Sequence, residues 1–306
     1  MTFNKALYDL CTAAASFHDY AADQMRDMGL QQCKADPNLW MHEGPEQDGY
    51  DYIALYIDDF LIVAKRPEDY LDKMKQDIII KKAEKNPSYY LGLQLARTNT
   101  GKLWISNSRY TYEALRRIEL KSGELKKELL LVSPGDKPEE DESALVDGKG
   151  VKAFQEMIDI AQWISGMARF DITFALTNIS CFSVAPREGH LDHTRKIFGY
   201  LKFFPGKSIP MDPRTLPNLP SEERIRPDFG RQYWDFIDLV DKSLPRSLED
   251  ELPIVMYVDS NLKHDWITGR SISGVLAFAG KLPVVATSKR QEAVATSMYC
   301  VKFCAL

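Results

Sequence analysis

Apolar residues recur at steps of three and four along much of the chain, the spacing that places them on one face of a helix. Over residues 10–28 this spacing predicts an amphipathic helix that ends at Gly29. The same periodicity predicts further helices over 67–85, 108–118, 154–165, 171–182 and 186–205, the last ended by Pro205 and Gly206. Helices therefore occupy much of the middle of the chain.

Short runs of β-branched and aromatic residues predict strands between and after these helices. The clearest is the stretch 52–64, in which two apolar runs flank the adjacent carboxylates Asp58 and Asp59. Asp tolerates turns and is disfavoured inside strands, so this stretch predicts an antiparallel hairpin with the acidic pair at its tip. Other predicted strands cover 89–95, 103–105, 254–258, 273–278 and 282–287, with a turn at 99–101 and a last helix from Gln291.

The acidic pair suggests a metal site. Two carboxylates held side by side repel each other unless a cation lies between them, and hard oxygen ligands favour Mg²⁺ or Mn²⁺. Such a pair is half of a two-metal site for phosphoryl transfer. Adjacent Asp residues are also common in ordinary turns, so Asp58 and Asp59 have a purely structural interpretation as well.

Composition narrows the class of protein. The chain has 306 residues, 44% of them hydrophobic and 27% charged, which is typical of a soluble protein of two or three domains. A net charge of −5 argues mildly against a strong nucleic-acid binder. Without an apolar run of 18 residues or an apolar signal core, we expect a cytoplasmic or nuclear protein with no membrane partner. The five cysteines are scattered, and His190 and His193 lack a third ligand at matching spacing, so neither set predicts a metal site.

Several motifs in a fixed order carry a family resemblance. Tyr56-Ile57-Asp58-Asp59 resembles the Tyr-x-Asp-Asp motif of reverse transcriptases. The segments that match in the same order are Lys5–Tyr8, Phe17–Asp19, Lys34–Pro37 with Trp40, Tyr90–Gly92, Gln162–Trp163, Arg169–Ile172 and Ala185–Leu191. Together they resemble the Pol polyprotein of copia-type LTR retrotransposons over nearly the whole chain.

The resemblance implies an α+β fold: a partial reverse-transcriptase palm with a helical thumb and connection, followed by an incomplete RNase H-like α/β domain. The implied boundaries are 1–120 for palm and start of thumb, 121–150 for an acidic linker, 151–205 for the connection, 206–252 for a Pro-rich linker with one short helix, and 253–306 for the RNase H-like part. The implied activity is RNA-directed DNA polymerisation, with template-primer and dNTP as partners. Asp58 and Asp59 would hold Mg²⁺ or Mn²⁺, and Tyr56 would contact the substrate.

The last segment resembles the RNase H domain of the same family through Tyr257–Asp259, His264–Asp265, Thr268–Ser271 and Ser288–Gln291. Asp259 falls where the family carries its first catalytic Asp. Lys302 stands where the family carries a Glu, and an ammonium group beside a metal site repels the ion. The resemblance therefore predicts an inactive RNase H part.

The polymerase part is also expected to be incomplete. In the family, the first palm Asp and the fingers precede the segment that begins at Lys5, and Asp36 and Asp51 are not expected to replace that carboxylate. The prediction is therefore a chain without polymerase activity of its own, with a missing N-terminal Pol portion as a further partner.

Two alternatives remain. One is an inert nucleic-acid-binding protein that contacts RNA–DNA hybrid through Lys81, Lys82 and Lys202. The other is an unrelated soluble α/β protein with a metal-binding hairpin.

Overall fold

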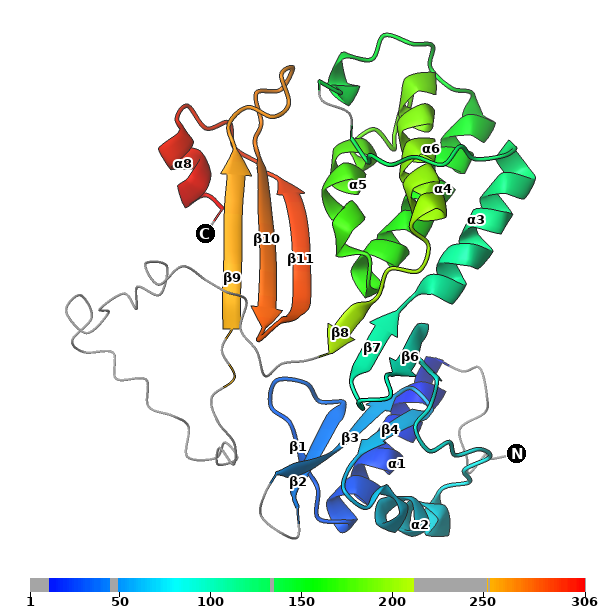
Figure 1. Ribbon diagram of the computed structural model, residues 1–306. Coiled ribbons are helices and arrows are strands. Elements are labelled where there is room, and N and C mark those ends of the chain that lie inside the picture. Colours follow the sequence, from blue (N-terminus) through cyan, green and yellow to red (C-terminus); the bar gives the residue numbers. More distant parts are fainter. Residues whose placement is uncertain (1–10, 45–48, 133–134, 212–251, 253, 306) are drawn as a thin grey trace, which may run out of the picture. The chain divides into compact units, whose positions relative to one another are not determined.

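The computed structural model describes residues 11–44, 49–132, 135–211, 252 and 254–305 (Figure 1). The chain divides into two compact units, with residues up to Lys85 in the first and residues from Asn86 in the second, apart from stretches between 212 and 251 that are not described. Mixed helix and strand in both units agree with an α+β fold. None of the described helices combines the length and the apolar character needed to cross a bilayer.

The first unit is an antiparallel sheet with helices packed on one face. The sheet has the order β1 (Gln31–Gln32), β2 (Leu39–Glu43), β3 (Tyr50–Tyr56) and β4 (Asp59–Val63), and it is joined by α1 (Cys11–Asp27) and α2 (Pro67–Asp77). The core between helices and sheet contains Ala22, Met25, Leu30, Trp40, Ile53, Tyr70, Met74 and Ile78. Gly29, at φ 86°, ends α1 in the left-handed conformation that glycine favours.

The second unit contains a small sheet and a helical core. The sheet has the order β5 (Tyr89–Tyr90), β6 (Leu93–Arg97), β7 (Leu103–Ser106) and β8 (Ile209–Met211). The helices are α3 (Ser108–Ser122), α4 (Gly148–Met167), α5 (Thr173–Ser180) and α6 (Glu188–Phe203), with short 3₁₀ turns at Pro138–Glu140 and Phe170–Ile172. All four helices contribute to one apolar core around Phe154, Ile164 and Phe198.

A second, three-stranded sheet ends the unit. Its antiparallel order is β11 (Leu282–Arg290), β10 (Ile272–Ala279) and β9 (Ile254–Asn261), and α8 (Met298–Phe303) follows it. The predicted strands at 254, 273 and 282 are confirmed. The last helix starts at Met298 rather than at Gln291, and Gln291 instead forms hydrogen bonds beside the sheet.

Other differences have local causes. The helix predicted over 67–85 ends at Asp77 because three consecutive isoleucines follow, and Ile78 already has extended backbone angles. The stretch 89–95 is a tight hairpin rather than one strand, since Leu91 and Gly92 have φ of 46° and 83°.

The two predicted linkers also contain structure. Strand β8 lies in the predicted 206–252 linker and pairs with β7, whereas the short helix expected near Tyr233 lies outside the described residues. The acidic stretch before α4 packs against α6, where Pro138 is buried and its carbonyl contacts His190.

Candidate metal-binding hairpin

Strands β3 and β4 form the predicted hairpin. Tyr56 pairs with Asp59, so the connecting loop consists of Ile57 and Asp58 alone. Ile57 has φ 55°, a left-handed conformation that is unfavourable for a β-branched residue. The prediction that the acidic pair lies at the hairpin tip is confirmed.

Strand alternation separates the acidic pair from the core. Asp51, Ile53 and Leu55 are buried on β3, whereas Tyr56 is 51% exposed. Asp59 is opposite Tyr56, and cross-strand partners share a face, so its side chain lies on the face away from the helices. This places Asp59 and Tyr56 on the open face of the sheet.

Asp58 and Asp59 are both exposed, and no described residue forms a hydrogen bond or ion pair with either carboxylate. Oxygen ligands of this kind suit a hard divalent cation. Within the described residues no group of three His, Cys, Asp or Glu side chains is placed to hold a metal ion. The described hairpin therefore offers two ligands and lacks a third.

Asp51 and Asp36 serve the fold. Asp51 is buried and accepts a hydrogen bond from the Tyr70 hydroxyl at Oδ2 (2.9 Å). Burial and this hydrogen bond raise the pKa of Tyr70 far above its ordinary value. Asp36 accepts a hydrogen bond from the backbone N–H of Asn38 (2.9 Å) in the turn before β2. Each of the two carboxylates therefore has a contact of its own within the fold.

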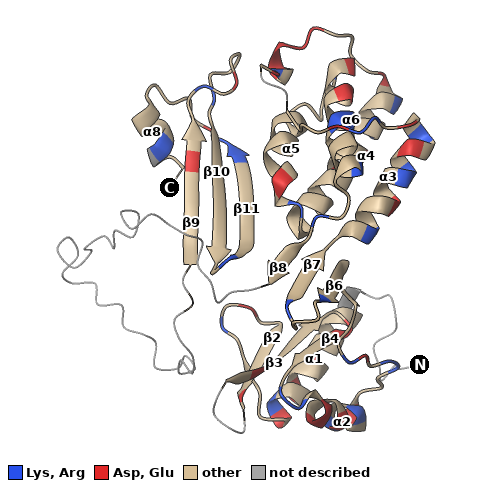
Figure 2. Ribbon diagram, in the orientation of Figure 1, with Lys and Arg blue, Asp and Glu red and all other residues tan. Residues whose placement is uncertain are grey.

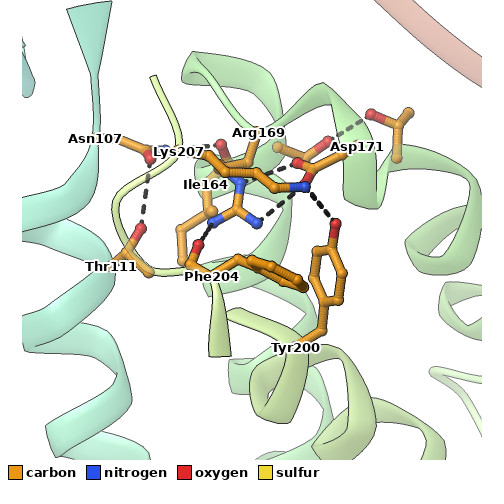
Figure 3. Close-up of polar contacts among 10 residues, drawn as sticks. Asn107, Thr111, Ile164, Arg169, Asp171, Tyr200, Phe204 and Lys207 are labelled. Carbon is orange, nitrogen blue, oxygen red and sulfur yellow. Dashed lines mark hydrogen bonds and ion pairs between the residues drawn. The ribbon is translucent and has the colours of Figure 1, made fainter. Parts of the chain in front are cut away.

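In the second unit the carboxylate of Asp171 has both of its oxygens hydrogen-bonded within the fold (Figure 3). Arg169, only 1% exposed, donates from Nε and Nη2 to the two carboxylate oxygens of Asp171 (2.9 and 3.0 Å) and from Nη1 to the Phe204 carbonyl (2.8 Å). Oδ2 of Asp171 also accepts hydrogen bonds from Tyr200 and Lys207, both at 3.0 Å. Burial alone would raise the pKa of Asp171, but the contacts with Arg169 and Lys207 hold it below its ordinary range.

Comparison with known proteins finds relatives of this chain. A putative transposon Ty5-1 protein of Saccharomyces cerevisiae is 25% identical over 198 residues, which cover 64% of this chain and 62% of that protein. A retrovirus-related Pol polyprotein from transposon RE1 of Arabidopsis thaliana is 25% identical over 213 residues, 67% of this chain but 14% of the polyprotein. The chain is homologous to retrotransposon Pol proteins. No family model and no solved structure matches it.

The Pol resemblance singled out Arg169–Ile172, Tyr90–Gly92 and Gln162–Trp163 as separate motifs, and the structure gives each a structural role. Gly92 lies against Trp163, where an added Cβ would be 3.6 Å from the indole ring. The backbone of Gly92 also requires positive φ. One contact therefore joins two motifs that are 70 residues apart in the sequence.

Asp259 lies within β9, opposite Gly274, and its side chain is exposed. Its neighbour Ser260 is buried on the other face, opposite its half-buried cross-strand partner Ser273. The Gln291 amide donates to Ser273 and to the Val301 carbonyl, so α8 is joined to the face that Asp259 does not occupy. Lys302, on α8, forms no described ion pair with Asp259.

Asp265, part of another motif of the Pol resemblance, is a structural carboxylate. It accepts backbone hydrogen bonds from Ile267 (3.0 Å) and Thr268 (2.9 Å) and an ion pair from Arg290 (2.9 Å). Burial would raise its pKa, but these donors hold it below the ordinary value. Asp265 therefore stabilises the loop between β9 and β10 by binding its backbone and Arg290.

The two histidines of α6 make polar contacts within the fold. His190 accepts a hydrogen bond from the backbone N–H of Arg187 at Nδ1 (3.0 Å), so the proton lies on Nε2, which contacts the Pro138 carbonyl (2.8 Å). His193 contacts the Gly189 carbonyl through Nδ1 (2.8 Å). Both rings hold the start of α6 in place.

The three lysines considered for nucleic-acid binding differ in how far their charge is already paired with carboxylates of the fold. Lys202 is paired with Glu119 (2.7 Å) and donates to the Leu125 carbonyl (2.9 Å), so its charge is used within the fold. Lys82 is paired with Glu84 (2.5 Å), and Lys81 is exposed. Figure 2 shows acidic and basic residues interspersed along α2 and α3. The described residues of these helices therefore form no uninterrupted basic face.

Proposed function

We propose that the chain derives from the RNA-directed DNA polymerase of a copia-type retrotransposon, and that Asp58 and Asp59 are a remnant of its pair of Mg²⁺ or Mn²⁺ ligands. The observation that carries the proposal is the β3–β4 hairpin, in which the two-residue turn exposes Asp58 and the next residue, Asp59, is exposed on the face of the sheet away from the helices. Asp51, Ile53 and Leu55, buried on β3, anchor the hairpin against the core of the first unit. Homology to Pol proteins of transposons supports the origin.

The bound ions would stabilise the attacking and leaving oxygens of nucleotidyl transfer. The chain's own contribution would be to fix Asp58 and Asp59 and to place Tyr56 beside them on the open face. The described residues offer no third carboxylate at the hairpin tip. We therefore propose that this chain alone does not catalyse DNA polymerisation. By the same reasoning we propose that Asp259 is an inactive RNase H remnant, because among the described residues it belongs to no group of three His, Cys, Asp or Glu side chains that could hold a metal ion.

Primer extension tests the proposal directly. The chain is incubated with a primed poly-A template, dTTP and Mg²⁺ or Mn²⁺, beside a retroviral reverse transcriptase as positive control. Asp58→Asn is compared with Asp36→Asn, which alters an exposed turn carboxylate far from the hairpin tip in sequence. We expect no extension by any form of the chain.

Extension that Asp58→Asn abolishes and Asp36→Asn preserves would disprove inactivity and would assign the metal role to the hairpin. Extension that survives Asp58→Asn would disprove the hairpin assignment itself. The chain is first shown to be folded by circular dichroism, so that a missing product reports on the site.

Residual binding of RNA–DNA hybrid is a second proposal, favoured by a shallow pocket on α3. Arg116, Arg117 and Lys121 line it together with Glu113 and Leu120. Glu156 neutralises part of this charge by pairing with Arg117 and Lys121. Fluorescence anisotropy with labelled hybrid should show weak affinity that falls with salt and falls further in Arg116→Ala but not in Lys81→Ala. Equal loss in both variants would disprove the assignment to α3.

A further inference from the structure

The last helix, α8, buries few of its side chains. It is six residues long, and among the described side chains from Glu292 to Ala305 the buried ones are those of Ala295 and Val301. Met298 and Tyr299, in the first turn of the helix, are exposed. A short helix gains most of its stability from packing, and a segment with few buried apolar contacts opens at a low cost in free energy.

The side-chain amide of Gln291 joins α8 to the sheet. Its Nε2 donates to the Ser273 hydroxyl on β10 (2.8 Å) and to the Val301 carbonyl on α8 (2.9 Å). A carbonyl can only accept, so the contact with Val301 determines which end of the amide is the nitrogen. The other end, Oε1, is buried and has no hydrogen-bond partner among the described residues.

A second buried polar atom lies on the same face of the sheet. Ser260, on β9, is the cross-strand partner of Ser273, and cross-strand partners share a face. Helix α8 packs beside β9, as Figure 1 shows, and Ser260 is only 7% exposed. Its hydroxyl has no hydrogen-bond partner in the part of the chain that the structure describes. The contact between α8 and the sheet therefore buries two polar groups without compensation.

These two groups favour separation of α8 from the sheet. A polar group buried without a hydrogen bond is costly, whereas the same group is hydrated when water reaches it. If α8 leaves the sheet, the Ser260 hydroxyl and Oε1 of Gln291 become hydrated, and this gain offsets part of the lost packing of Val301. The closed and opened states should therefore differ little in free energy.

We propose that residues 292–305 form a detachable segment, which opens from the sheet while the rest of the second unit stays folded. Opening uncovers the hydroxyl groups of Ser260 and Ser273 and the amide of Gln291. These groups lie on the face of β9 and β10 opposite to the one that carries Asp259. Helix α8 thus controls access to one face of the sheet and leaves the Asp259 face unchanged.

Hydrogen–deuterium exchange of the full chain, followed by mass spectrometry, tests the opening without any substitution. The amides of Val301 and Cys304 donate to the carbonyls of Ser297 and Cys300, so they exchange when α8 opens. The amides of α4, in the apolar core, report on unfolding of the whole unit. We expect the α8 amides to exchange well before those of α4. Equal exchange rates would overturn the proposal, because α8 would then open only when the unit unfolds.

A matched pair of serine substitutions tests the cause of opening. Ser260→Ala removes a buried hydroxyl that has no described partner and should slow exchange of the α8 amides at least about fivefold. Ser273→Ala, directly opposite on the same face, removes an acceptor of the Gln291 amide and should speed that exchange by a similar factor. Unchanged exchange in α4 verifies that both variants are folded. Unchanged or faster α8 exchange in Ser260→Ala would overturn the proposal, because the hydroxyl would then not favour opening.

Discussion

The hairpin tip and the Arg169–Asp171 pair both contain carboxylates, but only the carboxylate of Asp171 has partners within the fold. Both are acidic motifs that resemble Pol proteins. Asp171 accepts hydrogen bonds or ion pairs from Arg169, Tyr200 and Lys207. Asp58 and Asp59 accept none from the described residues. The difference separates a carboxylate that the fold pairs with a buried cation and a buried hydroxyl from two carboxylates that it leaves exposed.

The energetic consequence follows from burial. Arg169 is almost fully buried, so its guanidinium charge must be paired within the fold, and its contact lowers the pKa of Asp171. The pair at the hairpin tip is exposed, and water screens the repulsion between its two carboxylates. Mutations of the two motifs should therefore differ strongly in their effect on stability.

Asp171→Asn should have the largest effect. It leaves the Arg169 guanidinium buried without a counter-charge, and breaking a buried pair in this way costs about 3–5 kcal/mol. Urea unfolding monitored by circular dichroism at pH 7 measures the loss. Asp259→Asn is the matched control, because this exposed carboxylate has no described partner. A loss below about 1 kcal/mol for Asp171→Asn would contradict the contrast.

The pH dependence of stability sharpens the same point. Since the pKa of Asp171 is lowered in the folded chain, its contribution is fully present above the unfolded value near 3.8 and is lost as pH falls through the folded value. The free energy of unfolding should therefore fall in acid, by less than the substitution costs. Asp171→Asn should flatten the curve below about pH 4. Parallel curves for both proteins would disprove the contribution of Asp171.

Sequence alone predicted the hairpin well and the ion-pair network poorly. The Tyr52–Ala64 stretch is a local pattern, in which two apolar runs and a turn signal suffice to place Asp58 and Asp59. The Arg169 network depends on Phe204 and Lys207, more than 30 residues away, so periodicity could not reveal it. Only family resemblance marked Arg169 and Asp171, and it did not state their role.

Long-range pairing also explains the elements that were missed. Strand β8 is three residues long and contains Pro210, so it lacks the pattern of a strand and exists because β7 offers an edge. The same holds for the acidic stretch beside α6, where Asp141 lies near His190 and its pKa is lowered. Burial would raise that pKa, but hydrogen bonds from Ser143 and the nearby charge of Arg187 outweigh it. Composition suggested a linker because these partners come from distant residues.

Lys207→Met should have a smaller effect than Asp171→Asn. The Lys207 ammonium donates to Asp171 and to the Tyr200 hydroxyl, but its side chain is 45% exposed. Burial would lower its pKa, yet the contacts with Tyr200 and Asp171 raise it. Solvent screening limits the cost to about 0.5–1 kcal/mol, and Met retains the packing on Tyr200 and Phe204. Urea unfolding at pH 7 is again the measurement, and a cost equal to that of Asp171→Asn would mean that Lys207, not Arg169, is the main counter-charge.

Asp58→Asn should have the smallest effect on stability, within about 0.5 kcal/mol of the unmodified chain. Asn suits a turn as well as Asp does, and the substitution removes repulsion between neighbouring carboxylates. Differential scanning calorimetry without divalent ions measures the change, with Asp59→Asn as the companion variant. Destabilisation by more than about 1 kcal/mol would mean that the carboxylate has a structural partner. A neutral result for Asp58→Asn, beside a large loss of stability for Asp171→Asn, would mean that the acidic pair is not needed for folding. Its presence would then have to be explained by a chemical role.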